Sequence, residues 1–160
     1  MNRRAVFERL VASLVFVMAA ACFALPFLSV SVDQRRGEAT GIQLVREDED
    51  LQGHYVHDSY RGEVEQLVNR GELPAKIVLA FAVAGIAVAW VPGLWGLRLP
   101  LAAALLGLLG MAIFMRTTMP PFTPPDSDRR YGFWLLGALL VAAGTWCIVR
   151  LRRERVLLYD

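Results

Sequence analysis

Residues 10–32, "LVASLVFVMAAACFALPFLSVSV", pass from one kind of structure to another. Leu10–Leu28 is an apolar run, and a helix that crosses a bilayer core ~30 Å thick takes about 20 such residues. Beyond that run, apolar residues alternate with Ser29 and Ser31, and a period of two is typical of a β-strand. The stretch therefore predicts a membrane-spanning helix that runs directly into a folded segment outside the bilayer.

Three more apolar runs follow in the 160-residue chain, which is 56% hydrophobic: Ile77–Leu97, Leu99–Met115 and Phe133–Val149. Arg98 separates the second run from the third, and the third is short for a span. We therefore predict an all-α integral membrane fold, a bundle of four transmembrane helices. A small extracytoplasmic head stands between the first and second helices.

The head is predicted to begin with a β-hairpin over about residues 28–45. In "TGIQLV", residues 40–45, apolar and polar side chains alternate again, and the polar "DQRRGEA" joins the two strands. A lone hairpin is marginally stable in water, so we expect it to pack on another element. Its apolar side is the candidate interaction surface of the head and comprises Val30, Val32, Ile42 and Leu44.

A short helix over about residues 59–70 is the expected partner of this hairpin. Its apolar stripe includes Leu67 and Val68, and Gly71 is a typical residue for ending a helix. Pro74 would then redirect the chain into the second span.

The "RLRRERVLLYD" tail at residues 150–160 is the densest positive flank of the chain, and such flanks remain in the cytoplasm. Both termini are therefore expected to be cytoplasmic. The predicted layout is a tail and first helix over 1–28, the head over 29–75, a hairpin of helices two and three over 76–115, a Pro-rich outer loop over 116–132, the fourth helix over 133–151 and a basic tail over 152–160.

Each predicted span carries small residues four apart, which let helix backbones approach closely. We expect them to pack inside one compact bundle; the alternative is a face for a second copy or for a larger membrane partner. The pairs are Ala20 and Ala24, Ala80 and Ala84, Ala103 and Gly107, and Ala138 and Ala142.

The two cysteines, Cys22 and Cys147, lie near opposite ends of the first and fourth spans. At 1.5 Å of rise per residue they are separated by roughly 15 Å in depth, beyond the reach of a disulfide. "MAAAC" also resembles a lipoprotein signal, in which Cys22 would be lipidated after cleavage. The apolar "FALPFL" that follows favours an uncleaved first span instead.

"REDEDLQGHYVHD", residues 46–58, is the one cluster with the character of a metal site. Its histidines are three apart, which fits neither a helical zinc pair nor a Ca²⁺ loop. We favour a solvated turn and keep cation binding as the alternative. The candidate ligands are His54, His57, Asp58, Asp48 and Asp50.

Several function classes fit this sequence poorly. A net charge of +2 does not suggest nucleic-acid binding. The span interiors contain Ser13, Thr145 and the cysteines as their polar groups, whereas ion and proton pathways use intramembrane charges. No catalytic motif or cofactor motif is evident. We expect a non-enzymatic accessory or interaction subunit of a membrane complex, with a cation- or ligand-sensing protein and a small permease or channel component as alternatives.

"LPFLSVSVD" and "ATGIQLV" resemble segments of a family of small bacterial four-span inner-membrane proteins of unknown function. Those proteins carry LPF, a Ser/Thr-Val-Ser strand and then a Gly-hydrophobic-x-Leu strand after their first span. The resemblance covers about residues 25–45 and the four-span layout, and it implies a bacterial cytoplasmic membrane. Many relatives have Cys at the position of Val32. The layout is also similar to animal claudin-like tetraspans, whose outer-loop cysteine pair is absent here.

Overall fold

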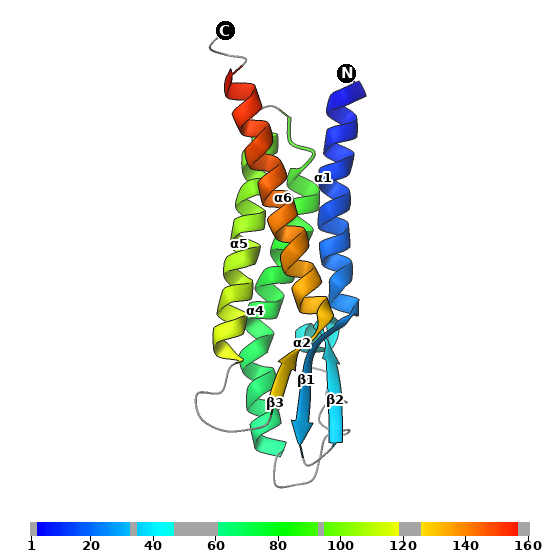
Figure 1. The fold of residues 1–160 in the computed structure, drawn as a ribbon, viewed down its shortest axis with the longest axis vertical. Helices are drawn as coiled ribbons and strands as arrows, with labels where there is room; N and C mark the ends of the chain where they lie inside the picture. The colour runs from blue at the N-terminus through cyan, green and yellow to red at the C-terminus, as the bar shows by residue number, and fades with distance from the viewer. Residues whose placement is uncertain (1–2, 33–34, 47–60, 93–94, 119–125, 157–160) are drawn as a thin grey trace.

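The computed structural model describes residues 3–32, 35–46, 61–92, 95–118 and 126–156, which are coloured in Figure 1. Four segments of this part of the chain are long and apolar enough to cross a membrane, which confirms the four predicted spans by length and composition: Val6–Ala24, Asn69–Val88, Trp95–Thr117 and Tyr131–Arg153. The helices that carry them are α1 Arg3–Ala21, α4 Arg61–Val88, α5 Trp95–Thr117 and α6 Tyr131–Val156.

The prediction that the third span is short is wrong, because α5 has 23 residues. The sequence predicts a break at Arg98, but α4 ends at Val88 and α5 already begins at Trp95. Arg98 is exposed, and its guanidinium carbon lies 5.9 Å from the centre of the Trp95 ring. An arginine so close to a helix end can extend to the interface and does not end a span.

The four helices form a closed ring of neighbours. Helix α4 packs against α1 and α5, and α6 packs against α5 and α1. Both ends of the chain lie at one end of the bundle and the β-sheet lies at the other (Figure 1). Two glycines of α5 allow close contact: a Cβ atom at Gly110 would be 2.8 Å from Val78 of α4, and one at Gly107 would be 3.1 Å from Leu140 of α6.

Helix α4 is one continuous helix, so the predicted end of a short helix at Gly71 is wrong. It runs from Arg61 through Gly71 and Pro74 into the second span. Gly71 serves close packing instead, because a Cβ atom there would be 3.1 Å from the Phe114 ring and 3.2 Å from Thr118 Cγ2. Pro74 is buried inside the helix. Close packing of Gly71 on α5 thus outweighs its low helix propensity, and α4 accommodates Pro74 without ending.

The predicted hairpin is present, but its second strand begins earlier than expected. Strand β1 Pro26–Val32 pairs antiparallel with β2 Arg35–Thr40, and Val32 lies opposite Arg35. The polar segment that we expected to connect the strands is therefore most of β2. The segment predicted to be the second strand itself, residues 40–45, lies almost wholly in the short helix α2 Gly41–Arg46, so that part of the prediction is wrong.

Thr40 and Gln43 explain why α2 is helical. The Thr40 hydroxyl oxygen accepts a hydrogen bond from the Gln43 backbone N–H at 3.2 Å, and Gln43 Oε1 accepts one from the Thr40 N–H at 2.9 Å. This reciprocal pair is a capping box, which stabilises the first turn of a helix. The Thr-x-x-Gln signal was visible in the sequence, but the alternation of Ile42 and Leu44 obscured it.

A third strand comes from the loop before α6. Strand β3 Asp126–Arg129 pairs antiparallel with β1, so the order in the sheet is β2-β1-β3 and β1 is central. We had expected a stiff Pro-rich connection over 116–132; its prolines lie outside the described residues. The sequence of β3, "DSDR", has no apolar alternation and so gives no strand signal. It can still form an edge strand, because backbone hydrogen bonds to β1 do not depend on the side chains.

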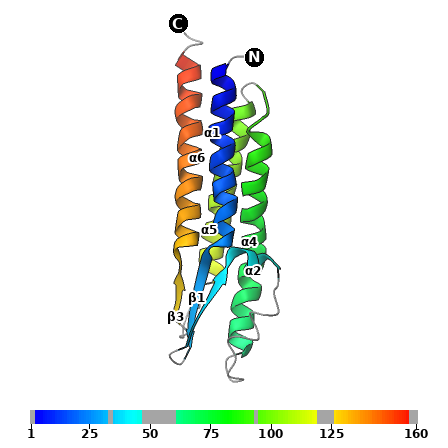
Figure 2. The ribbon, with the colours of Figure 1, turned by 90° about the vertical axis from the view of Figure 1, so that its right-hand side faces the viewer.

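The sheet and the first part of α4 extend from the bundle at the same end, which is seen best from the side in Figure 2. Helix α2 contacts both of them, since it packs on α4, on β1 and β2 and on the 3₁₀ turn η1 Cys22–Ala24. The head therefore packs directly against the bundle and is not joined to it by a linker alone.

Candidate functional site

An aromatic cluster seals the head to the bundle. Phe133 at the start of α6 lies 6.1 Å from Phe27 of β1 and 5.6 Å from Phe114 of α5, measured between ring centres. Phe27 in turn lies 4.8 Å from Phe23 of η1. All four rings are buried. Because aromatic pairs at these distances attract each other beyond their burial, the cluster holds four elements in one arrangement.

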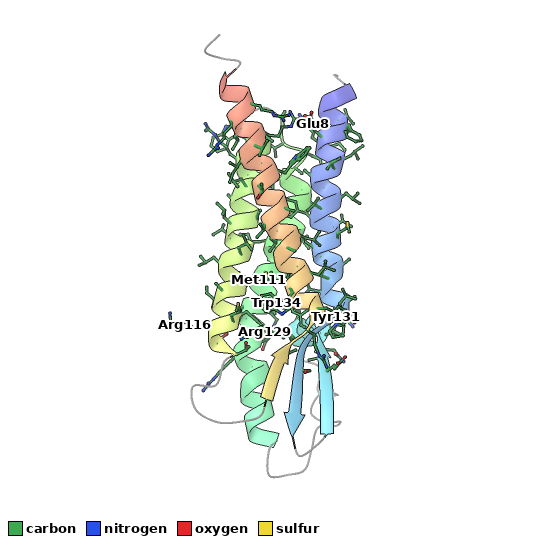
Figure 3. The ribbon with its side chains drawn as sticks, viewed as in Figure 1. Glu8, Met111, Arg116, Arg129, Tyr131 and Trp134 are labelled. Atoms are coloured by element: carbon green, nitrogen blue, oxygen red, sulfur yellow. The ribbon has the colours of Figure 1, made fainter. Side chains whose placement is uncertain are left out.

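Two arginines between β3 and α6 reinforce this junction. Arg129 donates a hydrogen bond from Nη2 to the Met115 carbonyl at 3.1 Å, and its guanidinium carbon lies 6.0 Å from the centre of the Phe133 ring. Arg130 pairs with Glu38 of β2, with 2.7 Å between Nη2 and Oε1. Figure 3 shows Arg129, Tyr131 and Trp134 gathered where α6 meets the sheet. The two outer loops are thereby joined by an ion pair as well as by the sheet.

The four residues predicted to form the interaction surface of the head do not share one face. Leu44 is buried, whereas Ile42 is 42% exposed. Both belong to α2, where positions two apart point in different directions. Val30 and Val32 belong to β1, and their side chains lie outside the described set. Ile42 is thus the one residue of the four whose side chain is seen on the surface.

The predicted helix-packing residues divide into an inward and an outward group. Ala103 and Gly107 of α5 are buried, and Ala20 of α1 is half-buried. The other five are exposed on this chain; they are Ala24, Ala80, Ala84, Ala138 and Ala142. Ala80 and Ala84 lie on the outer side of α4 and Ala138 lies on the outer side of α6, whereas Ala142 borders a cavity between α6 and α1.

The predicted metal ligands His54, His57, Asp58, Asp48 and Asp50 all lie in 47–60, outside the described residues. Among the residues that are described, no group of three or more His, Cys, Asp or Glu is placed to hold a metal ion. Cys22 and Cys147 are free thiols and both are buried.

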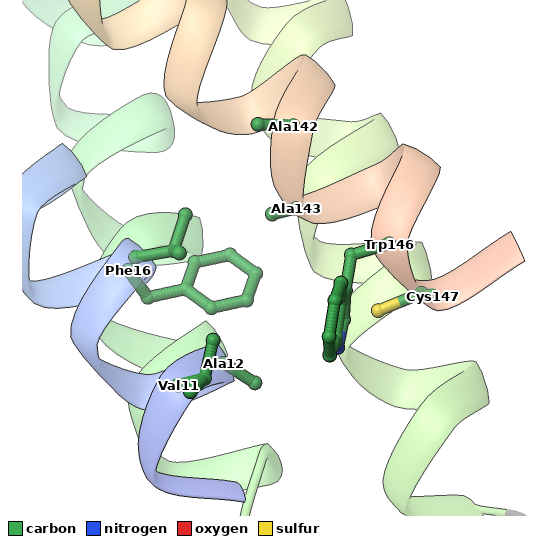
Figure 4. A pocket seen from close by; sticks show the side chains of 8 residues that line it. Val11, Ala12, Phe16, Ala142, Ala143, Trp146 and Cys147 are labelled. Carbon is green, nitrogen blue, oxygen red and sulfur yellow. The ribbon is translucent and has the colours of Figure 1, made fainter. Parts of the chain in front are cut away.

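A cavity of about 160 Å³ lies between α1 and α6, in the half of the bundle nearer the termini. Phe16 and Trp146 face each other across it, and Ala142 and Ala143 line it from α6 (Figure 4). Cys147 also borders it, and the other lining side chains are apolar. No signal within a single segment predicts this cavity, because it exists only where small residues of α1 and α6 face each other.

An ion pair closes the gap between the same two helices one turn nearer the termini. Glu8 of α1 pairs with Arg150 of α6, and the Arg150 guanidinium carbon lies 5.9 Å from the centre of the Trp146 ring. Glu8 lies at the end opposite the sheet (Figure 3). The signal available in the sequence was a carboxylate before the first span and an arginine after the last, at ends expected on the same side.

The fold and these surfaces define a four-helix bundle of membrane-span composition with a rigidly seated head of three strands. We found no match to this chain among protein-family models, curated proteins or solved structures.

Proposed function

We propose that this chain is a multi-pass protein of the bacterial cytoplasmic membrane that acts as a non-enzymatic interaction subunit of a membrane complex. Its four apolar helices support the membrane location. The arginines at the terminal end of α6, among them Arg150, Arg152 and Arg153, support cytoplasmic termini and an extracytoplasmic head. The resemblance around residues 25–45 supports a bacterial origin.

The outer face of α4 carries this proposal. Ala80, Ala84 and Ala87 recur at helical spacing and are all exposed. The larger exposed side chains near them are Leu73 at 66%, Val83 at 53% and, just beyond the end of α4, Trp90 at 46%. Small residues in such a row let the backbone of a second helix approach closely, which is how helices associate where lipid supplies no hydrophobic drive.

The outer face of α5 provides the contrast. Its exposed residues include Leu105, Leu106, Leu109 and Ile113, each more than two-fifths exposed. Such branched side chains suit contact with lipid chains, and they keep a second helix at a distance. The partner we propose for α4 is therefore a transmembrane helix, either of a second copy or of another membrane protein.

Crosslinking in the membrane tests this proposal. In a background with Cys22→Ala and Cys147→Ala, a cysteine in place of Ala84 that carries a photoreactive maleimide should crosslink to a partner helix on illumination, and the same probe on a cysteine in place of Leu106 should not. The mass of the product separates a second copy from another protein. Equal crosslinking at both positions would argue against a partner face on α4.

A second test places larger side chains on the proposed contact face and measures how much partner is still bound. Replacing Ala80 and Ala84 with Ile should lower recovery of the partner in a detergent pull-down, without crosslinking, on the order of tenfold, the effect of about 1.4 kcal/mol. Ala112→Ile is the matched control, because Ala112 is an exposed alanine of α5. Undiminished recovery from the α4 variant would contradict the proposal.

A further inference from the structure

The cavity between α1 and α6 lies within the apolar length of both helices. Its lining residues fall between Val11 and Phe16 on α1 and between Ala142 and Cys147 on α6. The spans that contain them are Val6–Ala24 and Tyr131–Arg153. If the chain is placed in a bilayer as proposed above, hydrocarbon is the medium around this cavity.

The size and the chemistry of the cavity suit an acyl chain. An apolar cavity of about 150 Å³ stays free of water and admits benzene, so about 160 Å³ holds a chain segment of roughly six carbons. A helix is at least 10 Å across with its side chains, which is too wide for this space. Methylene groups in the cavity would add dispersion contacts with its apolar lining, chiefly with Trp146, which is 44% exposed.

The same face of α6 continues into basic residues. Trp146, Arg150 and Arg153 follow one another at i, i+4 and i+7, so they share the face that lines the cavity. At 1.5 Å per residue, Arg153 lies roughly 10 Å beyond Trp146 towards the terminus. A lipid chain in the cavity would place its phosphate at this level, beside two arginines. Among the described side chains, Glu8 is a carboxylate at this level, and it is paired with Arg150.

We propose that this cavity binds one acyl chain of an anionic phospholipid, whose phosphate is held by Arg150 and Arg153. The site rests on the proposed membrane placement. It is independent of the proposed partner face, because that face lies on α4, which does not line the cavity.

Native mass spectrometry of the full-length protein tests the chain site. The protein is released from micelles that contain equal amounts of phosphatidylglycerol and phosphatidylcholine, and the retained lipid is weighed. The wild-type protein should retain one phosphatidylglycerol. Ala142→Leu should reduce this retention about tenfold, because the added side chain fills the cavity from α6.

Ala12→Leu fills the same cavity from α1 and should give the same loss, which guards against misfolding of either variant. Ala138→Leu is the matched control, because Ala138 is exposed on α6 one turn away and does not line the cavity. Retention by both filled variants equal to that of the control would overturn the proposal.

Charge variants test the phosphate contact. Arg150→Gln combined with Arg153→Gln should bring the preference for phosphatidylglycerol over phosphatidylcholine close to one. Glu8→Gln removes the competing carboxylate but keeps both arginines, so it should raise that preference severalfold. A wild-type protein that retains the two lipids equally would also overturn the proposal. The α4 substitutions Ala80→Ile and Ala84→Ile should leave lipid retention unchanged. The experiments can therefore contradict the proposed partner face without contradicting the lipid site, and the reverse.

Discussion

The ring of Phe16 on α1 lies directly against Gly85 on α4, so that a Cβ atom at position 85 would come within 2.3 Å of Phe16 Cδ1. Phe16 is 1% exposed, and both residues are in the apolar part of their helices. This contact sets how closely α1 and α4 approach, because the glycine leaves the space that the ring occupies.

Gly85→Ala is therefore expected to destabilise the protein by about 1–3 kcal/mol, the usual range for overpacking a core. The gain in helix propensity, up to ~1 kcal/mol, offsets only part of this cost. The measurement is the free energy of unfolding in mixed micelles. The matched control is Gly144→Ala on α6, where the nearest atom is Leu101 Cδ1 at an ordinary 3.8 Å and no loss is expected.

Phe16→Leu in the Gly85→Ala background should recover part of the lost stability, because the smaller side chain gives the new methyl group room. Equal stability of the Gly85 and Gly144 variants would show that the ring moves aside at little cost, contrary to this prediction.

Thr40→Ala should loosen α2. The substitution removes the hydroxyl oxygen that accepts the Gln43 N–H, and loss of such a cap costs about 0.5–2 kcal/mol. Hydrogen exchange of the backbone amides of 41–46 should speed up accordingly. Thr40→Ser keeps the hydroxyl and should exchange like the wild type; if it exchanges as fast as the alanine variant, the capping box does not hold α2.

Phe133→Ala should separate the head from the bundle. The ring contacts Phe27 and Phe114 and is 1% exposed, and removal of a buried phenylalanine ring costs about 3–5 kcal/mol. We expect faster proteolysis in the head while helix content by circular dichroism is retained. Leu135→Ala on the same helix is the control, because Leu135 is 46% exposed. Cleavage at the same rate in both variants would refute a sealing role for Phe133.

Cysteine labelling checks the proposed orientation. In the background free of native cysteines, Arg70→Cys near the head end of α4 should react with a membrane-impermeant maleimide on intact cells. Arg153→Cys at the terminal end of α6 should react only after lysis. Both native side chains are exposed, so the protein itself does not shield either position from the maleimide. The reverse pattern would place the termini outside.

The local pattern was sufficient for the long helices. Length and apolarity are properties of a segment by itself, so four apolar runs, the third of them predicted too short, indicated the four helices that the structure contains. The strand around Ser29 and Ser31 was also predicted correctly, because alternation is a local signal. The ends of the elements were predicted less well: α1 ends at Ala21 and β1 already begins at Pro26, inside the run expected to be helical, and α4 continues through Gly71 and Pro74.

In the outer loops, short sequence patterns do not predict the secondary structure correctly. Ile42 and Leu44 alternate like strand residues, yet they belong to a capped helix. Strand β3 has no apolar pattern, and only its pairing with β1 makes it a strand. The same limit applies to the small residues, since nothing in the spacing of Ala103 and Ala80 distinguishes the buried alanine from the exposed one.

The sequence by itself thus determined that the chain forms four helices of span length with a folded segment after the first, because each helix is set by the apolarity of its own residues. Only the tertiary structure decided how these parts meet: the third strand beside β1, the aromatic seal at Phe133, the Phe16–Gly85 contact and the cavity between α1 and α6. Those features depend on which residues of distant segments face each other, and that is set by packing between elements, not by the pattern within any one of them.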